Sequence, residues 1–155
     1  SANKDRYFPE IMNWNLAISN SDKNQTYNTP SITTLFYLNE QIQKMNIGGY
    51  KEVIRDGFEK AQYVYDWAQS HPLLSCFIET PKYRSNVVCT IDVDESIPAD
   101  EIISVLEREK IVYGIDAYRK LGRNQFRIGV FHNVSLDDVK KLTRLLSWCV
   151  GQYSN

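Results

Sequence analysis

Residues 126–131, FRIGVF, have the pattern of a β-strand with one apolar face and one mixed face. Successive side chains of a strand point to opposite sides of the sheet, so residues two apart share a face. Phe126, Ile128 and Val130 therefore face one way, and the opposite face carries Arg127, Gly129 and Phe131. The pattern predicts a strand that packs one face on a core and presents an arginine on the other.

The segments around this strand predict further strands and helices. Short apolar runs bounded by turn residues indicate strands at 73–78, 87–93 and 111–115. A helix is expected to begin near Pro98, and a last helix after Ser135, which lies three residues before Asp138 as in a capping box.

A longer helix is expected upstream, over residues 49–70. It carries an apolar stripe and ends at His71-Pro72, because a residue that precedes proline is disfavoured in the α conformation. From residue 73 the predicted order is β-β-α-β-β-α, and short links favour antiparallel neighbours. The predicted fold class is α+β, a two-layer sandwich in which a small antiparallel or mixed sheet packs against helices.

The first 30 residues differ from the rest. They lack a long apolar periodicity and resemble an extended arm with exposed apolar groups, which would cover its own domain or a partner. A flexible N-terminus is the alternative. Pro30 is expected in the first turn of a helix that Gly48-Gly49 stops.

Composition excludes several classes of protein. The 155 residues are 43% hydrophobic and 24% charged, with a formal net charge of −1, so no overall basic field attracts nucleic acid or an acidic membrane. No apolar run approaches the ~20 residues that span a bilayer, and the first residues lack the apolar region of a signal peptide. We therefore expect neither a nucleic-acid partner nor a membrane partner.

Cysteine and histidine usage indicates the compartment and argues against a metal site. Cys76, Cys89 and Cys149 are an odd number at wide spacing, which predicts a reducing, cytoplasmic location rather than a disulfide framework. With only His71 and His132 besides, no zinc site is expected.

The segment 117–136 is basic, with four cations and no acid. It contains Arg119, Lys120, Arg123 and Arg127, and Gly122 would let backbone amides approach a ligand. The segment is a candidate anion site, and a solvated basic loop is the alternative.

Arg127 favours the anion site because it lies inside a strand rather than in a loop. Its planar guanidinium suits a bidentate carboxylate or phosphate. A salt bridge to Asp92 or Asp116 is the structural alternative.

Residues 24–30, NQTYNTP, offer a second candidate site. Amide and hydroxyl donors before a helix can hold a phosphate, since the free N–H groups and the helix dipole both favour an anion. In the simpler interpretation Thr29 caps the helix and its neighbours form a turn.

The sequence contains no arrangement of Ser, His and Asp or of Cys and His that predicts nucleophilic catalysis, and no phosphate-binding glycine loop. These patterns therefore predict no site for nucleophilic catalysis.

Two motifs carry a family resemblance. Residues 17–30, AISNSDKNQTYNTP, and 118–127, YRKLGRNQFR, resemble phosphoserine aminotransferases, most of all their actinobacterial branch. Pieces between them, such as YDWAQ at 65–69 and TID at 90–92, also fit in order. The resemblance covers nearly the whole chain.

The resemblance implies a homodimeric, pyridoxal-phosphate-dependent enzyme of the aspartate-aminotransferase fold type, which exchanges an amino group between O-phospho-L-serine and 2-oxoglutarate in serine biosynthesis. Asn28 and Thr29 would reach the cofactor phosphate in the neighbouring subunit, and Arg127 would hold the substrate α-carboxylate. Arg119 and Lys120 lie near the position where other branches bind the substrate phosphate with a His-Arg pair, and Arg123 is an equal candidate.

The family's Schiff-base lysine would lie upstream of residue 1, so the resemblance is to a C-terminal part only. Residues 1–46 would be an arm and a helix from the end of the large domain, and residues 47–155 the C-terminal small domain. The N-terminal large domain is then a partner, and we expect the isolated chain to fold from about residue 47 but not to transaminate.

Two alternatives remain open from the sequence. The chain could be the same domain of another class V aminotransferase with a different small substrate. It could also be a stand-alone regulatory module that binds an anionic metabolite.

Overall fold

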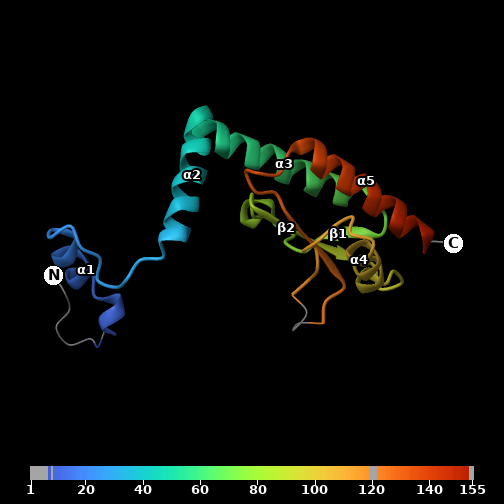
Figure 1. Cartoon of the computed structure of the whole chain (residues 1–155). Helices are drawn as coiled ribbons and strands as arrows, with labels where there is room; N and C mark the ends of the chain where they lie inside the picture. Colours follow the sequence, from blue (N-terminus) through green and yellow to red (C-terminus); the bar gives the residue numbers. More distant parts are fainter. Residues whose placement is uncertain (1–6, 8, 119–121, 154–155) are drawn as a thin grey trace. The chain divides into compact units, whose positions relative to one another are not determined.

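Helix α3 (Tyr50–Ser70) contributes several buried side chains to the hydrophobic core. The computed structural model describes residues 7, 9–118 and 122–153, and α3 is one of its long helices (Figure 1). Ala61, Val64 and Ala68 of this helix are fully buried. The helix predicted over 49–70 is confirmed. It ends at His71, which has an extended backbone before Pro72.

Three short strands form one antiparallel sheet. They are β1 (Leu74–Cys76), β2 (Val88–Val93) and β3 (Gln125–Gly129), in the order β1-β2-β3. The register places Thr90 opposite Arg127 and Ile91 opposite Phe126. A 3-10 turn, η2 (Pro81–Tyr83), lies between β1 and β2.

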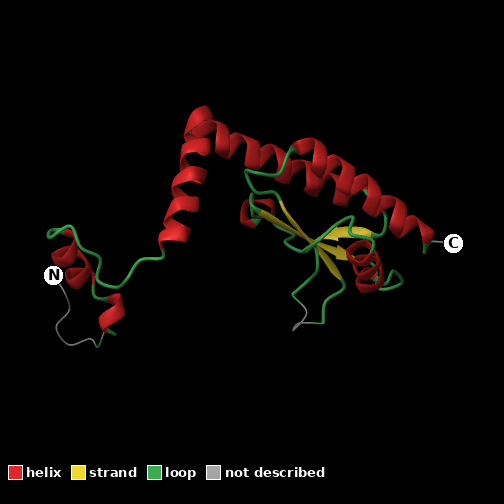
Figure 2. Cartoon of the chain, in the orientation of Figure 1, coloured by secondary structure: helices red, strands yellow, loops and turns green. Residues whose placement is uncertain are grey.

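Helices cover one face of this sheet. Helix α5 (Leu136–Gln152) packs beside α3 on that face, and α4 (Ala99–Arg108) contributes apolar side chains to the same core (Figure 2). The core contains every second residue of β3, namely Phe126, Ile128 and the following Val130, each at most 1% exposed. The predicted α+β sandwich and the predicted inward face of the strand are confirmed.

The prediction of a strand over residues 111–115 is wrong. Asp116 forms only an isolated bridge with Phe126, and the backbone N–H groups of Ile111 and Val112 donate back to the carbonyl of Leu106 at the end of α4. Lys110 and Gly114 both have positive φ, which interrupts extended backbone. The segment is therefore a helix-terminating loop that touches the edge of β3 at a single bridge.

Ser135 caps α5 as its spacing predicts. Its hydroxyl accepts a hydrogen bond from the Asp138 backbone N–H (3.1 Å) and donates one to the Asp138 carboxylate (2.7 Å). The cap fixes where the chain enters α5, after the short connection that follows β3.

The chain has two compact units, Ser1–Lys44 and Met45–Asn155. The first contains η1 (Glu10–Met12), α1 (Trp14–Ser21) and most of α2 (Ile32–Gly48), and none of the residues described in these helices is buried. The prediction of an extended arm is therefore wrong for α1, which is a helix. The Asn13 side chain caps α1 by accepting a hydrogen bond from the Asn15 backbone N–H.

The predicted place of Pro30 is also wrong. Helix α2 begins at Ile32, so Pro30 precedes the helix instead of lying in its first turn. The end of the same helix is confirmed, because Gly48 is its last residue and Gly49 separates it from α3.

None of the helices in the described part of the chain combines the length and the apolarity needed to cross a bilayer.

Candidate functional site: the open face of the sheet

The face of the sheet opposite α3 and α5 carries the predicted anion-binding residues. Thr90 of β2 pairs with Arg127 of β3, and the N–H of Phe77, just past β1, donates to the Thr90 carbonyl (3.2 Å). Phe77, Thr90 and Arg127 therefore form a row across the sheet, on the side away from the core. We call this side the open face.

Arg127 presents an exposed guanidinium on the open face. Its side chain has no hydrogen bond or ion pair to another residue in the described part of the chain. The alternative salt bridge to Asp92 is not formed, because the Asp92 carboxylate accepts from the Gln125 side-chain amide instead (2.6 Å). An arginine fixed in a strand, with its five donors free of described partners, is suited to a planar oxyanion.

Arg123 lies at the other end of the row. Its guanidinium carbon is 4.6 Å from the centroid of the Phe77 ring, a cation–π distance that holds the charge over an aromatic platform. Gly122, with φ +60°, provides the left-handed turn before it. Arg119 and Lys120, also predicted to bind substrate, lie outside the described residues.

Asn124 anchors the start of β3, and the sequence analysis missed it. Its side-chain amide donates to the carbonyls of Val93 (3.1 Å), Asp94 (2.9 Å) and Ile97 (2.8 Å), and its side-chain oxygen accepts from the Ala99 N–H (3.1 Å). This residue ties the strand that carries Arg127 to the connection between β2 and α4. Its only sequence signal is its place in the motif at 118–127, since an asparagine before a strand usually indicates an ordinary turn.

Asn28 and Thr29 are exposed in the loop between α1 and α2, in the first unit. Thr29 does not cap the helix, as the simpler interpretation expected, because α2 begins only at Ile32. The residue directly before the helix is Ser31, whose hydroxyl contacts that of Thr34 (2.8 Å). An exposed amide and an exposed hydroxyl are donors that suit phosphate oxygens. The donor set therefore fits a cofactor phosphate.

The thiols and His71 belong to the structure of the core and its edges. All three cysteines are free and buried, and burial raises the pKa of Cys89 to about 11, so its thiol stays protonated and a poor nucleophile at neutral pH. Burial lowers the pKa of His71, whose ring nitrogen accepts from the Leu73 N–H (3.2 Å). Among the described residues, no group of three or more His, Cys, Asp or Glu could hold a metal ion.

The geometry defines an α+β domain with a candidate anion-binding face: one side of a small sheet is packed under helices, and the other carries a row that ends in two arginines. No model of a protein family matches the chain. Individual proteins do match it, and they specify what kind of domain this is.

Curated relatives named phosphoserine aminotransferase align with nearly the whole chain. The protein of Rhodococcus opacus is 37% identical over 148 residues, which are 95% of this chain and 39% of the relative. That of Corynebacterium glutamicum is 42% identical over 140 residues, which are 90% of this chain and 37% of the relative. The chain thus spans about two fifths of the length of these relatives.

Solved structures agree in fold. A phosphoserine aminotransferase from Cytophaga hutchinsonii has a TM-score of 0.75 at 25% identity, and covers 86% of this chain with 36% of its own. The enzyme from Bacillus circulans subsp. alkalophilus has a TM-score of 0.77 at 18% identity, and at that identity the likeness shows the fold alone. The chain is therefore a relative of phosphoserine aminotransferases that corresponds to their C-terminal part, and the resemblance found in its motifs is confirmed.

Proposed function

We propose that this chain is the substrate-carboxylate-binding domain of a phosphoserine transaminase. The complete enzyme would convert O-phospho-L-serine and 2-oxoglutarate to 3-phosphohydroxypyruvate and L-glutamate. The relatives' shared name supports the activity, and the exposed Arg127 on the open face, which has no side-chain partner among the described residues, supports the role of this domain.

Arg127 is the residue on which the proposal depends most. Every donor and acceptor of the reaction carries a carboxylate next to the carbon that gains or loses the amino group. A guanidinium fork held by a strand binds such a carboxylate with two parallel hydrogen bonds and fixes the orientation of the reacting carbon.

The second anion of the substrate is assigned to the cationic end of the row. O-phospho-L-serine has a phosphate and 2-oxoglutarate has a second carboxylate, so one cationic wall serves both. Arg123, supported by Phe77, is the described candidate, and Arg119 with Lys120 are the candidates just before it in the sequence.

Pyridoxal 5'-phosphate is the cofactor of the proposed enzyme, and Asn28 with Thr29 would donate to its phosphate across a homodimer. When bound, it supplies the electron sink of the reaction, and a lysine outside this chain would carry it. Residues 1–46 would belong to the end of the large domain and residues 47–155 to the small domain. The three free thiols fit the cytoplasm, where a serine-biosynthetic enzyme would act.

The decisive experiment compares the native gene product with this chain. We expect the product from its source cells to have a mass far above the 18.0 kDa of the chain, and to transaminate O-phospho-L-serine with 2-oxoglutarate. The chain alone, with added cofactor, should not exceed the rate of free cofactor.

Other results would identify the alternatives. A larger product that prefers an unphosphorylated amino acid would be another class V aminotransferase. A native mass near that of the chain, with saturable binding of an anionic metabolite and no transamination, would establish the regulatory module and refute the enzyme.

A further inference from the structure

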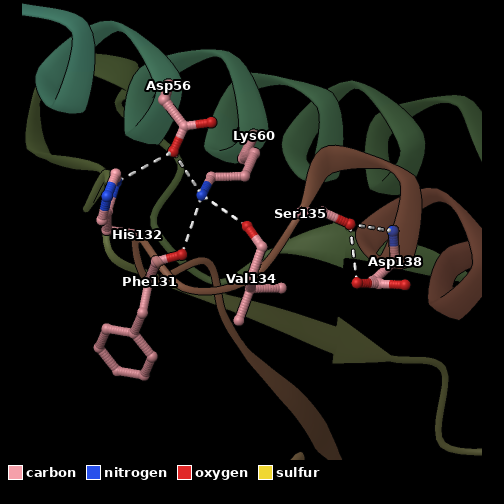
Figure 3. Close-up of polar contacts among 7 residues, drawn as sticks. All are labelled: Asp56, Lys60, Phe131, His132, Val134, Ser135 and Asp138. Carbon is pink, nitrogen blue, oxygen red and sulfur yellow. Dashed lines mark hydrogen bonds and ion pairs between the residues drawn. The ribbon is translucent and has the colours of Figure 1, made fainter. Parts of the chain in front are cut away.

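Lys60 is a buried cation with a complete set of partners. Its side chain is 0% exposed, yet it lies in the middle of α3 facing the end of β3. The ammonium contacts the Asp56 carboxylate (2.6 Å) and donates to the main-chain carbonyls of Phe131 (2.9 Å) and Val134 (2.8 Å) (Figure 3). An ammonium has three N–H donors, so each has an acceptor.

A buried charge is tolerated only when it is paired and hydrogen-bonded, so the loss of any of these acceptors would leave a buried N–H donor of Lys60 without a partner. Two of the three acceptors belong to one turn, residues 131–134, which the Val134 N–H closes on the Phe131 carbonyl (2.9 Å). The third, Asp56, is partly exposed and also lies 3.9 Å from the His132 ring nitrogen. Lys60 therefore fixes the turn that follows the Arg127 strand to α3.

The fixed turn determines where the Phe131 ring stands. A Cβ atom added at Gly129 would lie 2.7 Å from a ring carbon of Phe131, so the ring packs directly over the bare backbone of Gly129. Gly129 and Arg127 are on the same face of β3, two residues apart. The ring thus occupies the open face on the side of Arg127 that leads to the turn.

We propose that Lys60 is a positioning residue for Arg127. By holding the Phe131 carbonyl, it keeps the aromatic ring over Gly129, and the ring forms a wall that limits the directions available to the neighbouring guanidinium. The inference rests on the proposed function, because it takes Arg127 to be the group that binds the substrate carboxylate.

The test uses the complete transaminase with Lys60→Met. The variant keeps the length of the side chain and removes its three donors, so the turn loses its attachment. We expect KM for both O-phospho-L-serine and 2-oxoglutarate to rise about tenfold or more, with kcat changed far less, because a misplaced guanidinium weakens binding of both substrates. The inhibition constant of glutarate, an unreactive dicarboxylate, should rise by the same factor.

Two further variants separate positioning from stability. Phe131→Ala removes only an exposed ring, so it should fold normally and still raise KM for both substrates. Leu146→Ala, in the core portion of α5, should lower the melting temperature and leave KM unchanged. If Lys60→Met does not fold, Phe131→Ala decides the matter, and an unchanged KM in that variant overturns the inference.

A crystal structure of the complete Lys60→Met protein gives a readout that needs no activity. The expected result is a Phe131 ring displaced from Gly129 and an altered Arg127 side chain, and an unmoved pair overturns the inference. A wild-type protein without transaminase activity would refute the proposed function instead, so the two failures are distinguishable.

Discussion

The two faces of β3 perform different tasks with the same five-residue strand. One face buries Phe126 and Ile128 under α3 and α5, with less than 2% of either side chain exposed. The other carries Arg127 and Gly129, which contribute little apolar burial. Apolar area removed from water stabilises the fold, at roughly 25 cal/mol per Å². The open face is free of that requirement, so its residues can be selected for binding.

The sharpest test of this division replaces neighbours on opposite faces. Phe126→Ala should lower the free energy of unfolding by about 3–5 kcal/mol, because it leaves a large cavity in the core. Arg127→Ala should change it by less than about 0.5 kcal/mol. Urea unfolding of both variants measures the difference, and equal losses would show that the two faces are not separate in function.

Arg127 should matter as much to binding as Phe126 does to stability. In the complete enzyme we expect Arg127→Ala to weaken transition-state binding by about 2–5 kcal/mol, because the bound substrate carboxylate would lose the charged partner that the guanidinium provides. Arg127→Lys should restore only part of the loss, because a lysine lacks the planar fork. Steady-state kcat/KM measures the effect, and activity within twofold of wild type would remove Arg127 from the substrate site.

Asn124 ties the start of the strand to the connection between β2 and α4. Asn124→Ala removes the side-chain NH2 group that serves three carbonyls and the oxygen that accepts from Ala99, so we expect about 1–3 kcal/mol of lost stability. Asn124→Asp is the matched variant, since it keeps the acceptor for Ala99 and loses the donors. Thermal unfolding compares them, and a negligible change in both would mean that Asn124 does not anchor β3.

Arg123 tests whether the row recognises two anions. We expect Arg123→Ala to reduce kcat/KM for O-phospho-L-serine about tenfold, or about 1.4 kcal/mol, and to affect an unphosphorylated amino acid much less. Phe77→Leu should produce a smaller change in the same direction, because the cation–π contact is worth about 0.5–1 kcal/mol at an exposed site. An equal effect on both substrates would leave phosphate recognition to Arg119 and Lys120.

The smallest expected effect is at the entry to α5. Ser135→Ala removes the cap and should cost about 1 kcal/mol of stability, whereas Ser135→Asp should retain most of it. Urea unfolding measures both. Losses that are the same for alanine and aspartate would show that the side-chain oxygen is not what stabilises this helix end.

Local patterns predicted the elements whose causes are local. The alternation at 126–131, the long amphipathic helix before His71-Pro72 and the cap at Ser135 depend on neighbours within a few residues, and each is found in the structure. The errors have non-local or competing causes. The segment 111–115 has an apolar composition suited to a strand, but its N–H groups are already bonded to the end of α4.

The sequence by itself determined the class of the fold, the inward face of β3 and the identity of the basic residues, because spacing and side-chain type establish these. Only the tertiary structure showed that Arg123 stacks on Phe77, that Asn124 connects three segments and that Lys60 is buried. No periodicity distinguishes this lysine from those on the surface. Its burial arises because α3 crosses the turn after β3, where two carbonyls and a carboxylate meet one ammonium.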